Sequence, residues 1–190
     1  HGIHIASLEP LMAEGIKLLI TCDTGISASR EVAWAKAHKM DVVITDHHEL
    51  PESLPDADAI INPRMLPVDH PLYPLPGCGV AYKLAEELLA RSDAASFTPS
   101  LLDLAALGIV ADAAELRGEC RYLLRRGLAA LRSTNRVGLQ QLFETAKVDS
   151  ALITEETISF AIAPRMNALG RLDDANGIVD FLTTNSNSEA

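Results

Sequence analysis

The order of apolar and polar residues predicts alternating helices and strands over the first third of the chain. Residues 5–15 predict a helix, because apolar side chains recur there at helical spacing and Gly15 stands near the end. Short apolar runs predict three buried strands, over residues 17–22, 41–45 and 57–61. Strands that alternate with helices imply right-handed crossovers, and the expected fold is therefore α/β with a doubly wound, mainly parallel sheet.

The pattern changes after this first third. Residues 63–79 are rich in Pro and Gly and predict a loop, and the apolar spacing becomes helical from Val80 onward. Four later helices are predicted, over residues 100–111, 119–133, 137–147 and 154–162. Because no strong linker divides the chain, we interpret residues 1–190 as one partial domain. Its sheet part covers about residues 1–66 and its mainly helical part about residues 67–190.

Composition narrows the possible classes of protein. Apolar residues make up 48% of the 190 residues, and the net charge is −10. This acidity argues against a free-standing nucleic-acid-binding domain, which normally carries a basic excess, but two divalent ions would offset about four of the charges. The three cysteines are far apart, which suits a reducing cytoplasm and argues against a disulfide framework or a structural zinc site. No apolar run approaches the roughly 18–20 residues that cross a bilayer.

Polar side chains with metal-binding chemistry follow the first two predicted strands. Asp23 comes directly after the first strand, and Asp46, His47 and His48 come directly after the second. The carboxyl ends of neighbouring parallel strands share one edge of a sheet, so these side chains are expected to converge. Carboxylate oxygens combined with imidazole nitrogens suit Mn²⁺ or Mg²⁺. The alternative for Asp23 is a simple helix cap.

Several stretches resemble motifs of the DHH phosphoesterase superfamily. Three stretches resemble motifs shared by the whole superfamily, namely Cys-Asp-Thr-Gly at 22–25, Thr-Asp-His-His-Glu at 45–49, and residues 103–112. Those similar to its RecJ-like branch are Gly-Cys-Gly-Val-Ala-Tyr-Lys-Leu at 77–84, the Gly-Leu pairs at 127–128 and 138–139, and the Pro-Arg-Met-Asn-Ala-Leu-Gly-Arg loop at 164–171. The resemblance runs in order along nearly the whole chain. It implies a metal-dependent exonuclease of DNA repair and recombination that degrades single-stranded DNA from the 5′ end and releases 5′-mononucleotides.

The resemblance also implies roles for individual residues. Asp23 would bridge two metal ions, and His47 and Asp112 would complete the ligands of the second ion. His48 would contact the scissile phosphate, while Asp46 would orient a histidine as an outer partner. A helix-terminal or solvated carboxylate is the alternative for Asp112.

Other charged residues have less certain functions. Arg171 follows a glycine, and its guanidinium suits bidentate contact with a phosphate, but a salt bridge to Asp173 or Asp174 explains it equally well. We expect a helix cap or a surface role for Asp103. Arg64, just after Asn62-Pro63, could reach the crevice at the sheet edge, but we expect a surface role for it. A solvated helix face explains a run of arginines better than a phosphate-binding track does. The run comprises Arg117, Arg121, Arg125, Arg126, Arg132 and Arg136.

The chain departs from the family pattern at both ends. The first family motif, an upstream D-x-D, is absent, since residues 1–16 contain only Glu9 and Glu14 as acids. The C-terminal DHH-associated domain is absent too. We therefore expect this polypeptide alone to bind metal weakly and to be nearly inactive. A small-substrate phosphoesterase of the same superfamily, or a non-catalytic scaffold in a replication complex, are the alternatives. Single-stranded DNA is the implied partner, with a single-strand-binding protein as a further candidate.

Overall fold

The computed structural model describes residues 2–172 and 176–187, with the side chains left undescribed from residue 169 to 175. The backbone forms two compact units. The first unit contains residues 1–95 and 114–121, and the second contains residues 96–113 and 122–190.

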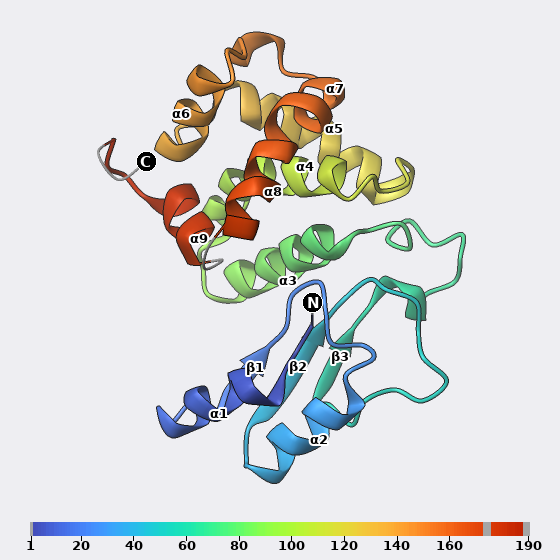
Figure 1. Cartoon of the computed structure of the whole chain (residues 1–190). Helices are drawn as coiled ribbons and strands as arrows, with labels where there is room; N and C mark the ends of the chain where they lie inside the picture. The colour runs from blue at the N-terminus through green and yellow to red at the C-terminus, as the bar shows by residue number, and fades with distance from the viewer. Residues whose placement is uncertain (1, 173–175, 188–190) are drawn as a thin grey trace. The chain divides into compact units, whose positions relative to one another are not determined.

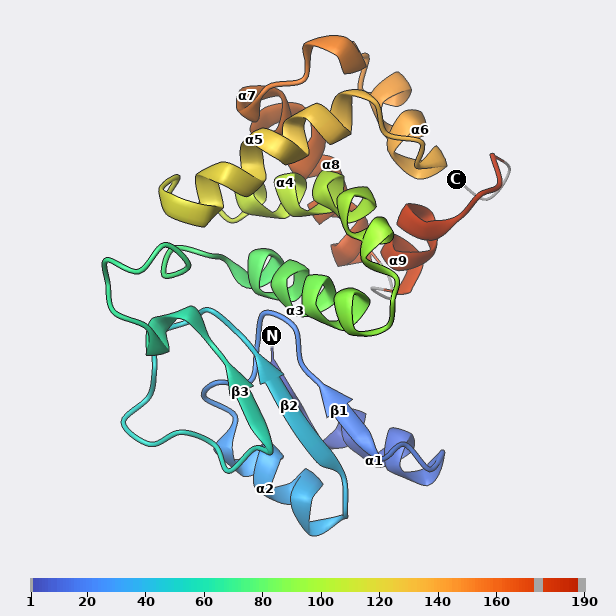
Figure 2. The same ribbon diagram turned by 180° about the vertical axis from the view of Figure 1, so that it is seen from behind.

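A parallel three-stranded sheet forms the centre of the first unit (Figure 1). Its strands are β1 (Leu18–Ile20), β2 (Asp41–Thr45) and β3 (Ala59–Ile61), in that spatial order. Leu18 pairs with Asp41 and Val43 pairs with Ala59, and Figure 2 shows the three strands side by side from behind. The α/β class with a parallel sheet is confirmed.

Two helices and the central strand share an apolar core. The helices are α1 (Ile5–Ala13) and α2 (Ser29–Ala37). The buried residues of this core are Leu8, Val32, Ala35, Met40, Val42 and Ile44. Val42 and Ile44 stand two residues apart, so both side chains point to the same face of β2. This buried face packs against α2, which contacts the strand. This packing fixes the register of the strands, and with it the positions of Asp23 and Asp46 at the carboxyl edge of the sheet.

The region after β2 differs in part from the sequence prediction. Residues 46–58, all of them described, contain no helix, so β2 reaches β3 through a loop. A short 3₁₀ turn follows at Pro63–Met65, and then the long helix α3 (Gly77–Arg91), which contacts β2. The predicted loop over 63–79 is therefore too long, because Gly77 and Gly79 lie in the first turn of a helix.

The second unit consists of helices packed closely through glycines. Its regular elements are α4 (Leu102–Ala111), α5 (Gly118–Arg132, which begins in the first unit), α6 (Val137–Thr145), α7 (Glu155–Thr157), α8 (Ala163–Leu172) and α9 (Asn176–Thr183). A Cβ at Gly127 would lie 2.5 Å from Ala106 Cβ, so α5 can cross α4 only because that position lacks a side chain. Gly138 of α6 has the same close contact with Phe181. The helical character predicted for this part is confirmed.

In the second unit, one predicted helix differs in its geometry and one predicted loop is helical. The helix expected over 154–162 is a single turn, α7, continued by a π-helix at Ile158–Ile162. The stretch 164–171, which we expected to be a loop, lies within α8. The helical conformation predicted over 154–162 is therefore confirmed, with π rather than α geometry over Ile158–Ile162. Within the described residues, no helix is both long and apolar enough to span a bilayer.

Candidate metal centre

Asp23 projects from a tight turn just beyond β1. Its φ is +61°, a left-handed conformation that Asp tolerates better than most residues. Its N–H donates to Thr45 O over 3.0 Å, which ties the turn to the end of β2. Two buried threonines reinforce this junction, since Thr45 Oγ1 donates to Thr21 O over 2.6 Å and Thr45 N donates to Thr21 Oγ1 over 3.2 Å. The two strand ends are thereby locked in register.

The structure brings Asp23, His47 and His48 together. The ligand atoms that these three side chains offer all lie within 4.8 Å of one another. His47 Nε2 lies 2.9 Å from Asp23 Oδ1, and the two imidazole rings are 4.6 Å apart between centroids. Ligand atoms about 2.0–2.2 Å from a shared ion are separated by roughly 3–4.4 Å, so this donor set suits a divalent cation and its spacing is close to the one that an ion requires.

Asp46 organises this loop from the inside. The residue is only 1% exposed, and its two oxygens accept four hydrogen bonds. Oδ2 accepts from Ile26 N over 2.9 Å. Oδ1 accepts from His47 N over 2.7 Å, from His48 Nδ1 over 2.7 Å and from His48 N over 3.3 Å. Asp46 thus contacts both the backbone and the side chain of the histidine that it was expected to orient.

The hydrogen bonds of Asp46 determine its charge. Burial alone would raise the pKa of this carboxyl, but the donors at Ile26, His48 and His47 together lower the pKa below its ordinary value. Asp46 is therefore an ionised acceptor at neutral pH, and His48 Nδ1 must carry the hydrogen that it donates. Desolvation, with the neighbouring Asp23 charge, raises the pKa of the Cys22 thiol, which favours its neutral form.

Two residues after β3 also hold the histidine loop, and the sequence analysis did not assign them to the site. Asn62 is 5% exposed, and its Nδ2 donates to His48 O over 3.0 Å while its Oδ1 accepts from Arg64 N over 2.8 Å. Arg64 Nε donates to His47 O over 3.3 Å, and its guanidinium lies 4.6 Å from the Tyr73 ring centroid. The surface role expected for Arg64 is wrong. The sequence feature that could have indicated this contact is the position of Arg64 directly after the third strand of the same sheet.

The remaining predicted site residues belong to the second unit. Asp112 follows the last turn of α4, where its N–H donates to Gly108 O over 3.0 Å, and it stays a predicted ligand. The backbone of Arg171 lies in α8, but its side chain lies outside the described residues, as do those of Asp173 and Asp174.

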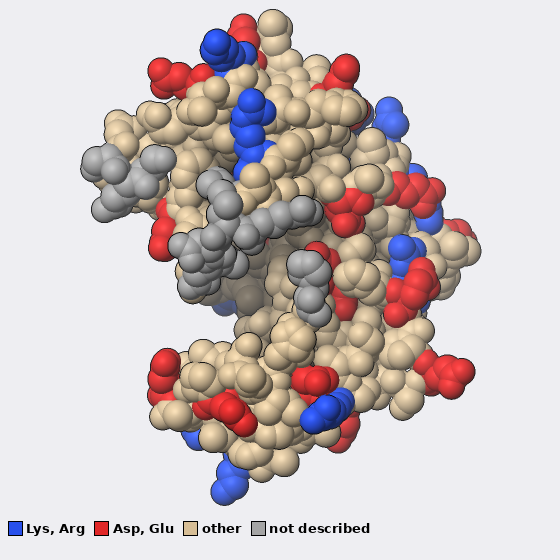
Figure 3. Space-filling view, in the orientation of Figure 1, with Lys and Arg blue, Asp and Glu red and all other residues tan. Residues whose placement is uncertain are grey.

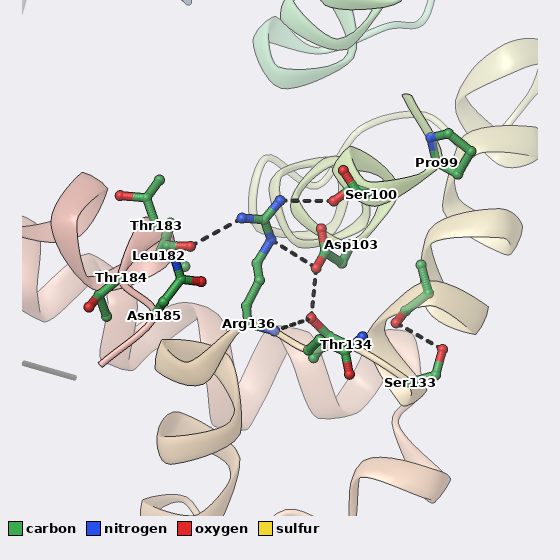
Figure 4. Close-up of a pocket in the computed structure, with 12 residues that line it drawn as sticks. Pro99, Ser100, Asp103, Ser133, Thr134, Arg136, Leu182, Thr183, Thr184 and Asn185 are labelled. Atoms are coloured by element: carbon green, nitrogen blue, oxygen red, sulfur yellow. Dashed lines mark hydrogen bonds and ion pairs between the residues drawn. The ribbon is translucent and has the colours of Figure 1, made fainter. Parts of the chain in front are cut away.

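Asp103 has a different role from the one expected. It is 5% exposed and is not the N-cap of α4, so the surface and cap interpretations are both wrong. Its Oδ2 accepts from Arg136 Nε over 3.0 Å and from Thr134 Oγ1 over 2.8 Å. Figure 4 shows the Arg136 guanidinium between this carboxylate and the carbonyls of Ser100 and Leu182. Asp103 therefore links separate helices of the second unit.

Comparison with known proteins gives consistent matches. The family model described as "DHH family, N-terminal domain" matches residues 3–109. The single-stranded-DNA-specific exonuclease RecJ of Bacillus subtilis is 40% identical over 190 residues, covering 100% of this chain and 24% of the relative. RecJ of Escherichia coli is 35% identical over 201 residues, covering 100% of this chain and 35% of the relative. The chain thus spans a quarter to about a third of the length of these relatives.

Solved structures agree with the sequence matches. The structure of RecJ in complex with Mn²⁺ from Thermus thermophilus matches with a TM-score of 0.85 and 32% identity, over 98% of this chain and 28% of that one. A structure of exonuclease RecJ bound to manganese matches with a TM-score of 0.86 and 32% identity, over 100% of this chain and 47% of that one.

Proposed function

This chain belongs to the DHH family, and we propose that it carries part of the metal centre of a single-strand-specific DNA exonuclease. The observation that supports the proposal most directly is the convergence of Asp23, His47 and His48 within 4.8 Å at the carboxyl edge of a parallel sheet. RecJ relatives matched over the whole chain are named single-stranded-DNA-specific exonucleases, which supports the choice of reaction.

The proposed ligands are Asp23, His47 and Asp112, and the proposed ions are Mn²⁺ or Mg²⁺. Structures of RecJ with Mn²⁺ support this choice of ion. Bound divalent ions supply a Lewis acid that offsets phosphoryl charge and lowers the pKa of a water molecule. Asp23 contributes a carboxylate that can bridge, and His47 contributes a neutral nitrogen. The loop that carries His47 is held by Asp46 and Asn62, and the turn that carries Asp23 is tied to Thr45, so little reorganisation is needed on binding.

We propose that His48 contacts the scissile phosphate. Its Nδ1–H is committed to the Asp46 carboxylate at 2.7 Å, which fixes the ring orientation and leaves Nε2 to meet a ligand. In its protonated form, His48 Nε2 is a donor suited to a phosphoryl oxygen. Arg171 is the proposed second cation for the phosphate.

The substrate that we propose is single-stranded DNA, cut stepwise from the 5′ end with release of 5′-mononucleotides in the cytoplasm, during repair and recombination. A single-strand-binding protein is the proposed partner that presents this substrate. The chain covers only part of its relatives, so this activity belongs to the full-length protein.

Metal binding is the direct test of the centre. We expect the 190-residue chain to bind Mn²⁺ weakly, as measured by electron paramagnetic resonance of free Mn²⁺, and Asp23→Asn or His47→Gln to weaken binding at least about tenfold. Asp69→Asn removes one exposed charge elsewhere in the same unit and should change nothing. Equal binding by all four proteins would refute the centre.

The reaction is tested with the full-length protein. Mn²⁺-dependent hydrolysis is compared on single-stranded DNA, on dinucleotides and on pyrophosphate. We expect single-stranded DNA to be preferred and His48→Ala to lose most of the activity. Preference for the small substrates would identify a small-substrate phosphoesterase instead, and hydrolysis of none of them would favour a scaffold.

A further inference from the structure

The six arginines between residues 117 and 136 divide into two groups. Three of them bind a backbone carbonyl or a carboxylate outside α5 within the described part of the fold. Arg117 donates to Val68 O over 2.9 Å, Arg132 donates twice to Ile153 O, and Arg136 pairs with Asp103. These three serve the structure, so neither a solvated face nor a phosphate track describes the run as a whole.

The other three arginines lie on the exposed side of α5 with no acid beside them on the helix. Arg121 and Arg125 are four residues apart, and like charges at this spacing destabilise a helix by a few tenths of a kcal/mol, roughly. The exposed Arg91 of α3, by contrast, has an acid at that spacing, Glu87 at 2.7 Å. The face in Figure 3 likewise shows acidic and basic side chains intermixed. The chain as a whole has a net charge of −10, so concentrated positive charge on one helix face is unexpected. Binding of an anionic ligand would explain it.

An aromatic ring stands within this basic face. Tyr122 is 51% exposed, its hydroxyl accepts from Arg126 over 2.8 Å, and the Arg126 guanidinium lies 5.7 Å from its ring centroid. Tyr122, Arg125 and Arg126 stand at i, i+3 and i+4, so they share one side of the helix. All three belong to the second unit. The hydrogen bond restrains both side chains before any ligand arrives, which reduces the entropy that binding must overcome.

The opposite side of α5 is buried and holds the helix in place. Leu123, Leu124 and Leu131 are each 1% exposed or less, and Gly127 packs directly on Ala106 of α4. A rigid helix that presents cations together with an exposed ring differs from a mobile basic tail. Such a surface combines the two elements by which single-stranded nucleic acids are held, namely cations for the backbone and aromatic faces for the bases.

We propose that the outer face of α5, formed by Tyr122, Arg125 and Arg126, binds single-stranded DNA at a site separate from the metal centre. The choice of DNA rests on the proposed function. Arg125 and Arg126 neutralise phosphates, and Tyr122 stacks against a base. An acidic peptide would use the guanidinium groups but would not need the exposed ring, so the ring favours DNA.

The test is binding of a fluorescent 20-nucleotide oligo(dT) by the full-length protein in EDTA, measured by anisotropy over a range of salt concentrations. For Arg125→Gln/Arg126→Gln we expect weaker binding, and a slope of log K against log [salt] that is shallower by about 1.4, because each single-strand phosphate contact contributes about 0.7. Tyr122→Leu should weaken binding about tenfold, whereas Tyr122→Phe should keep most of the affinity.

The matched control is Arg91→Gln, which removes one exposed positive charge from α3 and should leave the salt slope unchanged. An unchanged slope in the double variant overturns the proposal. The proposal is also overturned if poly-glutamate displaces the fluorescent oligo(dT) as well as unlabelled oligo(dT) does and Tyr122→Leu has no effect on binding. That result would identify an acidic protein ligand.

Hydrolysis separates this proposal from the proposed function. In Mn²⁺, the double variant should raise KM for the 20-nucleotide substrate and leave kcat and the hydrolysis of a trinucleotide unchanged. If the wild-type protein binds oligo(dT) through α5 but hydrolyses nothing, only the proposed function fails. If it hydrolyses DNA and the double variant matches it in binding and KM, only the α5 site fails.

Discussion

Gly77 lies directly against the side chain of Asp23. A Cβ at Gly77 would come within 2.5 Å of Asp23 Cγ and 2.6 Å of Asp23 Cβ, far inside van der Waals contact. Gly77 is also the first residue of α3, whose N-terminal end carries partial positive charge that favours a nearby carboxylate. The glycine therefore allows the start of a long helix to touch the proposed bridging ligand.

The first prediction concerns this contact. Gly77→Ala should displace the Asp23 side chain and weaken Mn²⁺ binding about tenfold, because ligand orientation depends on such outer contacts. Gly177→Ala is the control, since a Cβ there meets nothing within 4 Å. Mn²⁺ titration followed by electron paramagnetic resonance, with circular dichroism to verify folding, measures the effect. Equal affinity for the two variants would contradict the steric argument.

The second prediction concerns Asn62. Asn62→Ala removes a buried amide that joins His48 O to Arg64 N and leaves both groups without this partner. We expect a loss of about 1–3 kcal/mol in the free energy of unfolding and weaker Mn²⁺ binding. Asn135→Ala, at an exposed position, should alter neither quantity. Urea denaturation and Mn²⁺ titration give the two values, and a stability loss without any change in metal affinity would restrict Asn62 to a structural role.

The sequence predicted those parts of the site that depend on local pattern. An apolar run followed by an acid places Asp23 and Asp46 at the ends of β1 and β2, because parallel strands deliver their carboxyl ends to one edge. The same pattern placed His47 and His48 directly after Asp46, and the structure brings these two together with Asp23.

The pattern of apolar and polar residues could not predict which distant segments contact one another. Asn62 lies 14 residues from the carbonyl that it holds, and Gly77 touches a side chain more than 50 residues earlier. The pairing of Asp103 with Arg136 was missed for the same reason, since a helix period indicates that a position is near a buried face but not which cation reaches it. Gly77 and Gly79 were misjudged as part of a loop, whereas they begin α3 and Gly77 lies against the Asp23 side chain.

The third prediction concerns pH. The Lys36 ammonium, which hydrogen-bonds Asp58, together with the N–H of Val42 at 2.7 Å, lowers the pKa of Asp58 below its ordinary value of about 3.9. A carboxyl with a lowered pKa in the folded state adds stability above its unfolded pKa and loses it as pH falls through the folded value. Asp58→Asn should therefore lower the urea midpoint at pH 7, and the difference from wild type should shrink below about pH 4. Asp69→Asn should show no such pH-dependent difference, and a gap that persists at low pH would rule out the ion pair as its cause.

The last prediction concerns the buried pair in the second unit. Asp103 and Arg136 side chains are 6% and 20% exposed, and Arg136 also donates to Ser100 O and Leu182 O. Arg136→Met leaves a buried carboxylate without its cation, held only by the neutral donors Thr134 Oγ1 and Leu104 N, and we expect a loss of about 2–4 kcal/mol in unfolding free energy. Adding Asp103→Leu removes the orphaned charge, so the double variant should be more stable than Arg136→Met alone. Urea denaturation of all three proteins decides the matter, because a double variant that is less stable than the single one would mean that the pair contributes through packing rather than through charge.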